Sequence, residues 1–115
     1  MSSGNVVSFK YYQEIARSTA IYPNIGHNFT YPVLGLCGEA GEVAEKVKKI
    51  LRDRDGVLSE QDKVEVAKEL GDVLWYIAAI CSEFGLSMEA VADANAIKLR
   101  SRKERGVLQG SGDDR

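Results

Sequence analysis

Apolar residues recur at helical spacing in four stretches of the 115-residue chain. The spacing predicts helices over about residues 8–20, 32–52, 60–84 and 88–105. Ser59 and Ser87 stand where N-caps are expected, and Gly85 and Gly106 stand where the last two helices should stop. No useful run of strand-like alternation interrupts this pattern. We therefore expect an all-α fold, with the four helices packed as a bundle.

The third predicted helix is apolar on nearly every side between residues 70 and 81, a segment that reads LGDVLWYIAAIC. A helix without a solvent face is buried on more than one side. Four helices of this size leave part of such a surface uncovered. We therefore expect a homo-oligomer, in which a second copy covers the remaining face.

Composition narrows the class of protein. The chain has 15 basic and 17 acidic residues, for a formal net charge of -2, so affinity for duplex nucleic acid is not expected. A small phosphorylated ligand is compatible with this charge.

The longest apolar run, residues 73–81, is too short to cross a membrane, and the N-terminus lacks the pattern of a signal peptide. We expect a cytoplasmic protein with one domain over residues 1–106 and a flexible tail over residues 107–115.

The two cysteines, Cys37 and Cys81, lack the close spacing of a metal or redox motif. Both stand among small or apolar residues. The sequence therefore predicts two buried free thiols, which suit a reducing compartment.

Two pairs of acidic residues carry the candidate chemistry. Glu39 and Glu42 lie three apart on the second predicted helix, and Glu69 and Asp72 lie three apart on the third. Each pair shares a helix face, and each stands beside apolar or glycine positions. Four carboxylates converging in a bundle need a cation, and oxygen ligands favour Mg²⁺ or Mn²⁺ over Zn²⁺.

Two other interpretations fit acidic residues at such spacing. Glu42 and Lys46 have the spacing of an ordinary surface ion pair, which is common on helices. A di-iron site draws histidines from two helices. The only histidine, His27, lies in a predicted loop, so the ligands for di-iron are missing.

The fourth predicted helix supplies positive charge. Asn95, Lys98, Arg102 and Arg105 follow one another at helical spacing and form a polar, mostly cationic stripe. Beside a metal site, such a stripe suggests a polyanionic ligand. The competing interpretation is a solvated basic helix end, because cations are favourable near a helix C-terminus.

Glycines lie along one stripe of the second predicted helix at Gly35, Gly38 and Gly41. Each glycine costs a helix about 1 kcal/mol relative to alanine, so a compensating role is expected. Without side chains on this stripe, another backbone or a bound ligand can approach closely.

Three short motifs, in order on predicted helices, carry a resemblance to a known family. They are GEAGEV with Glu39 and Glu42, ELGDVLWY with Glu69, Asp72 and Tyr76, and NAIKLRSR with Asn95, Lys98 and Arg102. In these motifs the chain resembles, over about residues 8–106, the MazG family of all-α nucleoside triphosphate pyrophosphohydrolases. The resemblance implies a homodimer, or a homotetramer of two dimers, that uses Mg²⁺ to hydrolyse a (d)NTP to the (d)NMP and pyrophosphate.

The resemblance also implies roles for individual residues. The metal ligands would be Glu39, Glu42, Glu69 and Asp72. Glu39 and Glu42 would be the catalytic glutamates, and the substrate contacts would be Lys98, Arg102, Asn95 and Tyr76. Many relatives carry a further glutamate where this chain has Gly38. The general base is therefore left unassigned between another glutamate and a metal-bound hydroxide.

The resemblance implies that the nucleotide base is recognised largely by the first helix, the loop after it and a neighbouring subunit. The candidates for stacking or edge contacts are Phe9, Tyr12, Tyr22, His27, Asn28 and Trp75. Core packing is the competing interpretation for the helical aromatics. Two other functions stay open, namely a nucleotide-binding oligomer without catalysis and the same site acting on a (d)NDP or a modified nucleotide.

Overall fold

A computed structural model of the protein describes residues 7–115. These residues form four helices, α1 (Phe9–Ser18), α2 (Thr30–Arg54), α3 (Glu60–Glu83) and α4 (Met88–Glu104), and no strand. The predicted all-α fold is confirmed, and each helix ends within a turn of its expected bound. The first six residues of the predicted domain lie outside the described residues.

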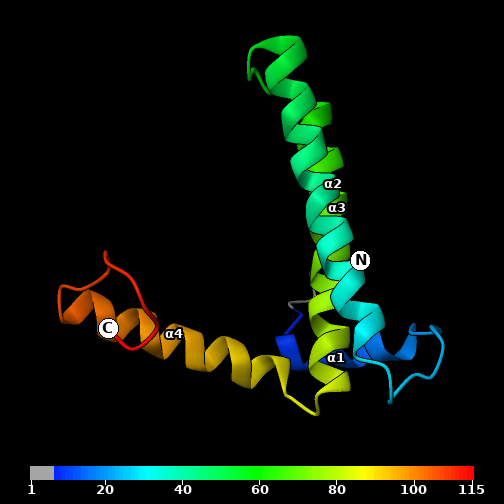
Figure 1. The fold of residues 1–115 in the computed structure, drawn as a ribbon, viewed down its shortest axis with the longest axis vertical. Coiled ribbons are helices and arrows are strands. Elements are labelled where there is room, and N and C mark those ends of the chain that lie inside the picture. The colour runs from blue at the N-terminus through cyan, green and yellow to red at the C-terminus, as the bar shows by residue number, and fades with distance from the viewer. Residues whose placement is uncertain (1–6) are drawn as a thin grey trace.

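Helices α2 and α3 form one long antiparallel hairpin (Figure 1). Asp55 ends α2 in the left-handed conformation at φ 54°, and Gly56 continues the turn at φ 79°. Ser59 then caps α3: its Oγ accepts from the Asp62 amide at 3.1 Å, while the Asp62 carboxylate accepts from the Ser59 amide at 2.8 Å. An ion pair between Arg54 and Asp62 closes the same turn. These local contacts set how α2 and α3 pair.

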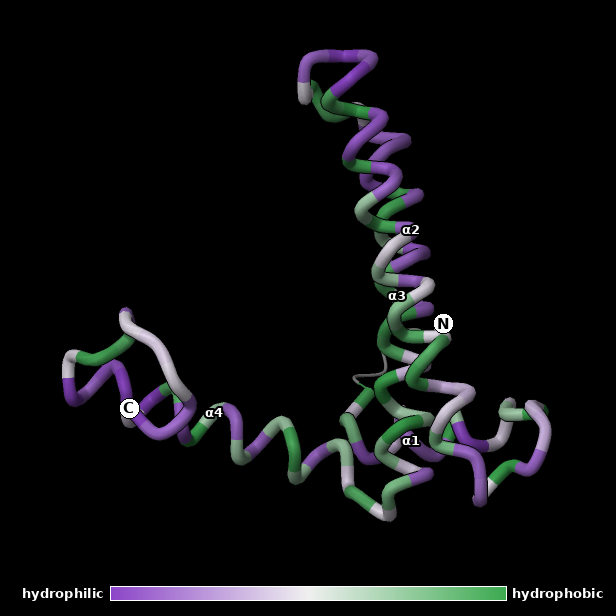
Figure 2. Tube along the Cα trace, in the orientation of Figure 1, coloured by the Kyte–Doolittle hydropathy of each residue, from purple (hydrophilic) through white to green (hydrophobic). Residues whose placement is uncertain are grey.

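Helix α1 packs against the C-terminal half of α3 and forms the core with it. The buried cluster consists of Ala16, Ala78, Cys81 and Met88, with Tyr12, Trp75 and Ile77 packed around it. Figure 2 shows apolar segments meeting at this end of the hairpin, whereas the far end is largely hydrophilic. The core is therefore small, and it lies at the end of the hairpin where α1, the C-terminal half of α3 and the start of α4 meet.

Gln13 joins α1 to the start of α4. Its amide nitrogen donates to Ser82 Oγ at 3.2 Å and to the Leu86 carbonyl at 2.9 Å. Its amide oxygen accepts from the Met88 amide at 2.8 Å. With Ser87 capping α4 through the Ala90 amide at 3.1 Å, these bonds fix the turn from which α4 departs.

Helix α4 leaves α3 at 105° and extends away from the hairpin (Figure 1). It contacts α1 and α3 but not α2. The radius of gyration is 17.1 Å, whereas a compact domain of this length has about 13 Å. The four helices therefore do not close into a bundle within one chain, because the turn that Gln13 holds directs α4 outward.

Many apolar side chains are left uncovered by this arrangement. On α3, Leu70 is 50% exposed and Leu74 is 40% exposed, although the sequence predicts that this segment is buried on nearly all sides. On α4, Ile97 is 61% exposed. Large apolar side chains left exposed on two helices are typical of interaction surfaces.

Both cysteines are free, but they differ in exposure. Cys81 is buried in the core as predicted. The prediction for Cys37 is wrong for the chain taken alone, since Cys37 is exposed. It lies on a face of α2 that no other described element covers.

No single helix among the described residues is long and apolar enough to span a membrane. Helices α3 and α4 meet the length and composition of a span only as a pair bent by 105°.

Candidate metal and nucleotide site

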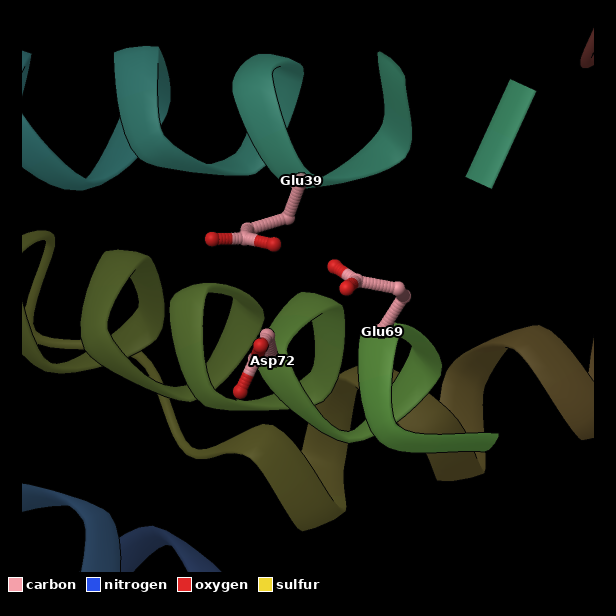
Figure 3. Close-up of side chains that lie close together, drawn as sticks. All are labelled: Glu39, Glu69 and Asp72. Atoms are coloured by element: carbon pink, nitrogen blue, oxygen red, sulfur yellow. The ribbon is translucent and has the colours of Figure 1, made fainter. Parts of the chain in front are cut away.

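Three carboxylates lie close together where α2 packs against α3. Glu39 points from α2 toward α3, and Glu69 points back toward it, with Asp72 one turn further along α3 (Figure 3). One carboxylate oxygen from each residue lies within 4.8 Å of the other two. We call Glu39, Glu69 and Asp72 the acidic cluster. The two acidic motifs were predicted to converge, and three of their four acids do so in the structure.

The acidic cluster holds excess negative charge. The pKa of Glu39 is raised above its ordinary value, first because its carboxyl hydrogen-bonds with Glu69 and then because desolvation and the charges of Asp72, Glu69 and Glu42 disfavour ionisation. A carboxyl group whose neighbours hinder ionisation is stabilised by a cation. The donor set therefore fits a hard divalent ion, which all-oxygen ligands prefer.

Glu42 lies outside the acidic cluster. It is exposed on α2, one turn after Glu39. The proposed surface pair with Lys46 is absent from the ion pairs of residues 7–115, in which Glu45 pairs with Lys48 at 3.0 Å instead. The side chain of Glu42 is thus left without an ionic partner in the described chain, and its role as a ligand stays a prediction.

A pocket of about 410 Å³ opens beside the acidic cluster. Thr19, Trp75 and Tyr76 line it together with the carboxylates of Glu39 and Asp72. The two aromatic rings meet edge to face, with centroids 5.1 Å apart. An aromatic wall next to an anionic site suits a ligand with a flat ring at one end and a metal-bound anion at the other.

Gly35 has a specific reason to lack a side chain. A Cβ placed on it would lie 2.1 Å from Cε1 of Tyr76, so the ring occupies the space that any larger residue needs. A Cβ on Gly38 or Gly41 meets nothing within 4 Å. The space that the missing side chain leaves at Gly35 is therefore filled by the Tyr76 ring of α3. Within the chain, Gly38 and Gly41 face open space.

The predicted cationic stripe lies on α4, away from the acidic cluster (Figure 1). Lys98 Nζ lies 3.3 Å from the carboxylate of Asp113, and an Arg102 nitrogen lies 3.6 Å from it. The same Arg102 donates to the Asp113 carbonyl at 2.7 Å, while its buried Nε has no partner. Asn95 is exposed on the same helix. Lys98 and Arg102 thus converge on one anion, but not on the acidic cluster of their own chain.

A hydrogen-bonded cluster around Glu83 is not predicted by any sequence pattern. Glu83 lies in the last turn of α3, and its side chain is 1% exposed. Its carboxylate accepts hydrogen bonds from Arg17, from the Tyr22 hydroxyl and from two backbone amides of the α1–α2 connection. Only the position of Glu83 in the sequence could have indicated this cluster. An acid at a helix C-terminus interacts unfavourably with the helix dipole and needs hydrogen-bond donors or cations around it. Its partners are distant in sequence and follow no local pattern.

Comparison with known proteins agrees with the three motifs. The sequence profile of the MazG nucleotide pyrophosphohydrolase domain matches residues 29–107. This span is more than half of the chain and contains the predicted metal ligands, the catalytic glutamates and the predicted contacts of Tyr76, Asn95, Lys98 and Arg102, whereas the candidates for base recognition before residue 29 lie outside it. The chain belongs to the MazG family.

Two relatives of this MazG domain were found among curated proteins. The chain is 49% identical to the gene 37 protein of Mycobacterium phage L5 over 109 residues, which are 90% of this chain and 96% of that protein. It is 40% identical to the uncharacterized protein YvdC of Bacillus subtilis strain 168 over 75 residues, which are 60% of this chain and 70% of YvdC. No solved structure gives a significant match. Membership in the family supports nucleotide pyrophosphohydrolase activity, and neither name states a substrate.

The contact between Gly35 and Tyr76 makes a first prediction for the MazG domain. Gly35→Ala should destabilise the protein by about 1–3 kcal/mol, because the Tyr76 ring must move out of its present place. Gly38→Ala is the matched control, and it should stabilise the helix by about 1 kcal/mol, since nothing opposes its methyl group. Urea unfolding measures both. Equal stability of the two variants would contradict the packing described here.

The acidic cluster makes a second prediction. In EDTA at about pH 8, Glu39→Gln should raise the melting temperature, because the substitution removes repulsion within the cluster. A raised folded-state pKa penalises the folded protein only above the unfolded value of 4.5, so the gain should vanish near pH 4.

Glu45→Gln is the control for this experiment. The pKa of Glu45 is lowered by its hydrogen bond to Lys48, so neutralising Glu45 should not stabilise the protein. A Glu39→Gln variant that melts no higher than the wild type at about pH 8 would show that the three carboxylates do not repel one another.

Proposed function

We propose that the protein hydrolyses a (deoxy)nucleoside triphosphate to the monophosphate and pyrophosphate at the acidic cluster. The convergence of Glu39, Glu69 and Asp72 from two helices is the observation that supports this most strongly. Family membership supports the broader activity, nucleotide pyrophosphohydrolysis. The triphosphate substrate and the metal are the finer parts of the proposal.

The acidic cluster would hold Mg²⁺, with Mn²⁺ as a substitute, and Glu42 would join it as a fourth ligand after a change of side-chain conformation. When bound, the ion would neutralise the phosphate chain and lower the pKa of water for attack on phosphorus. The carboxylates of Glu39, Glu69 and Asp72 would hold the ion beside the pocket. Because the general base is not assigned, Glu39 and Glu42 are both candidates for accepting the proton of water.

The pocket beside the cluster gives the substrate its orientation. Its aromatic side, formed by Trp75 and Tyr76, would take the nucleoside, while the phosphates would extend toward the carboxylates. With the base held at one end and the phosphates at the other, the reacting phosphorus would lie next to the proposed metal ligands.

The cations that grip the phosphates would come from a second copy of the chain. Within one chain, α4 and α2 make no contact, and Lys98 and Arg102 lie on α4. The exposed apolar residues of α3 and α4 provide the surface for self-association. We therefore propose a homodimer or a homotetramer in which each site combines an acidic cluster with the cationic stripe of a neighbour.

A nucleotide panel tests the activity. Incubated with each (d)NTP and Mg²⁺, the protein should release the monophosphate and pyrophosphate, and EDTA should stop the reaction. Glu39→Gln should lose more than about a hundredfold in kcat/KM, since removing a ligand costs at least as much as removing its supporting partner. The exposed Glu104 offers a control in Glu104→Gln, which should keep full activity.

The products separate this proposal from its alternatives. Release of orthophosphate alone would contradict it, and so would the absence of turnover of any triphosphate. Hydrolysis confined to a (d)NDP or a modified nucleotide would keep the site but change the substrate. Binding of nucleotide that Glu39→Gln does not weaken, without any turnover, would indicate a non-catalytic nucleotide-binding protein.

Mixing of variants tests whether sites are shared between copies. Glu39→Gln lacks a metal ligand, and Lys98→Ala lacks a phosphate contact, so each should be nearly inactive alone. Unfolding and refolding them together should restore part of the activity, because mixed oligomers contain one complete site. If mixed oligomers form and stay as inactive as their parents, the two residues do not come from different copies.

A further inference from the structure

Glu83 is the most heavily hydrogen-bonded carboxylate among the described residues. Its Oε2 accepts from Arg17 at 3.1 Å, from the Tyr22 hydroxyl at 2.5 Å and from the Gly26 amide at 2.8 Å, and its Oε1 accepts from the Asn28 amide at 2.8 Å. One donor comes from α1, and the other three come from the connection between α1 and α2. Glu83 therefore ties this whole connection to the end of α3.

The contacts of Glu83 keep it ionised. Burial opposes ionisation, but the hydrogen bonds from Tyr22, Asn28, Gly26 and Arg17 outweigh it and lower the pKa of Glu83 to about 2. Both carboxylate oxygens are engaged with donors. An amide in the same place would present its NH₂ group to one of these donors, so even an isosteric substitution breaks the arrangement.

Tyr22 connects Glu83 with the pocket. Its ring stacks on Tyr31, with centroids 4.9 Å apart and planes 13° apart, and meets Trp75 at 84° with centroids 6.5 Å apart. Tyr22 is 6% exposed, so its faces are occupied by protein. Trp75 in turn donates from Nε1 to Thr19 Oγ1 at 2.8 Å, and both residues line the pocket beside the acidic cluster.

We propose that Glu83 is a positioning residue for the nucleoside end of the pocket: by fixing the Tyr22 hydroxyl, it holds Trp75, one of the two rings of the aromatic wall, against α1. Glu83 does not line the pocket and acts through Tyr22. The inference rests on the proposed function for the identity of the ligand, and on the described contacts for the positioning. Its own consequence is that the α1–α2 connection determines how well nucleotide binds, whereas the acidic cluster determines how fast it reacts.

The test uses Glu83→Gln in the full chain, with Glu14→Gln as the control. Glu14 is an exposed carboxylate on α1, the helix that also supplies Arg17. Glu83→Gln should raise KM about tenfold, equal to about 1.4 kcal/mol, with kcat within about twofold of the wild type, because only binding shared by ground and transition states is lost. Glu14→Gln should change neither constant.

Fluorescence gives a second measurement that needs no turnover. Trp75 is the only tryptophan of the chain, so emission excited at wavelengths that tyrosine does not absorb, and its quenching by acrylamide, report on Trp75 alone. Glu83→Gln should red-shift the emission and make Trp75 more accessible to acrylamide, measured well below the melting temperature. Tyr22→Phe keeps the ring and removes the hydroxyl, so it should move KM and quenching in the same direction, even if Glu83→Gln fails to fold.

The outcomes separate the two proposals. If the wild type hydrolyses a triphosphate and both variants leave KM and quenching unchanged, Glu83 has only a structural role and the inference is wrong, while the proposed function stands. If no nucleotide is hydrolysed but Trp75 becomes more accessible in both variants, the positioning role stands and the proposed function fails. A fall of kcat with KM unchanged would also overturn the inference.

Discussion

The pairing of α2 with α3 is the constraint on which the site depends. The carboxylate of Glu39 meets that of Glu69 only in one register of the hairpin, because a shift of one residue turns a helix by about 100°. The capped turn between Arg54 and Asp62 sets this register at one end. Tyr76, seated against Gly35, holds it at the other. The acidic cluster, the pocket and its aromatic wall follow from that alignment.

Several features of the structure oppose stability in the chain taken alone. Like charges gather at the acidic cluster, the buried Arg102 leaves its Nε without a partner, and α4 extends away with apolar residues exposed. Departures from local preference of this kind concentrate at functional sites and interfaces. Here they occur at the proposed metal site, at the proposed phosphate contacts and on the surface proposed for self-association.

Sequence patterns predicted what depends on short range. The four helices and their capping serines follow from local periodicity and local hydrogen bonds, and the acidic pairs follow from helical spacing. The same spacing does not decide which acids converge: Glu69 and Asp72, three apart on α3, both join the cluster, whereas Glu42, three residues after Glu39 on α2, does not. Helical spacing restricts side chains to a shared face but does not bring them to one point.

Features set by distant contacts were not predictable in this way. The direction of α4 depends on Gln13, which bridges α1 to the α3–α4 turn. The Glu83 network joins α3 to backbone amides of a loop more than fifty residues earlier. The Gln13 bridge and the Glu83 network produce no periodic pattern in the sequence, because each is formed by single polar residues at unrelated positions. The motifs that carry the resemblance to the MazG family are visible in the sequence, but these supporting contacts depend on the three-dimensional arrangement alone.

The most direct measurement is the anomalous scattering of Mn²⁺ in crystals of the protein. The proposed metal centre predicts a peak among the carboxylate oxygens of Glu39, Glu69 and Asp72, which disappears in Glu39→Gln crystals grown with the same ion. Absence of a peak there, while Mn²⁺ is bound elsewhere on the protein, would contradict the proposal that these three carboxylates hold the catalytic metal.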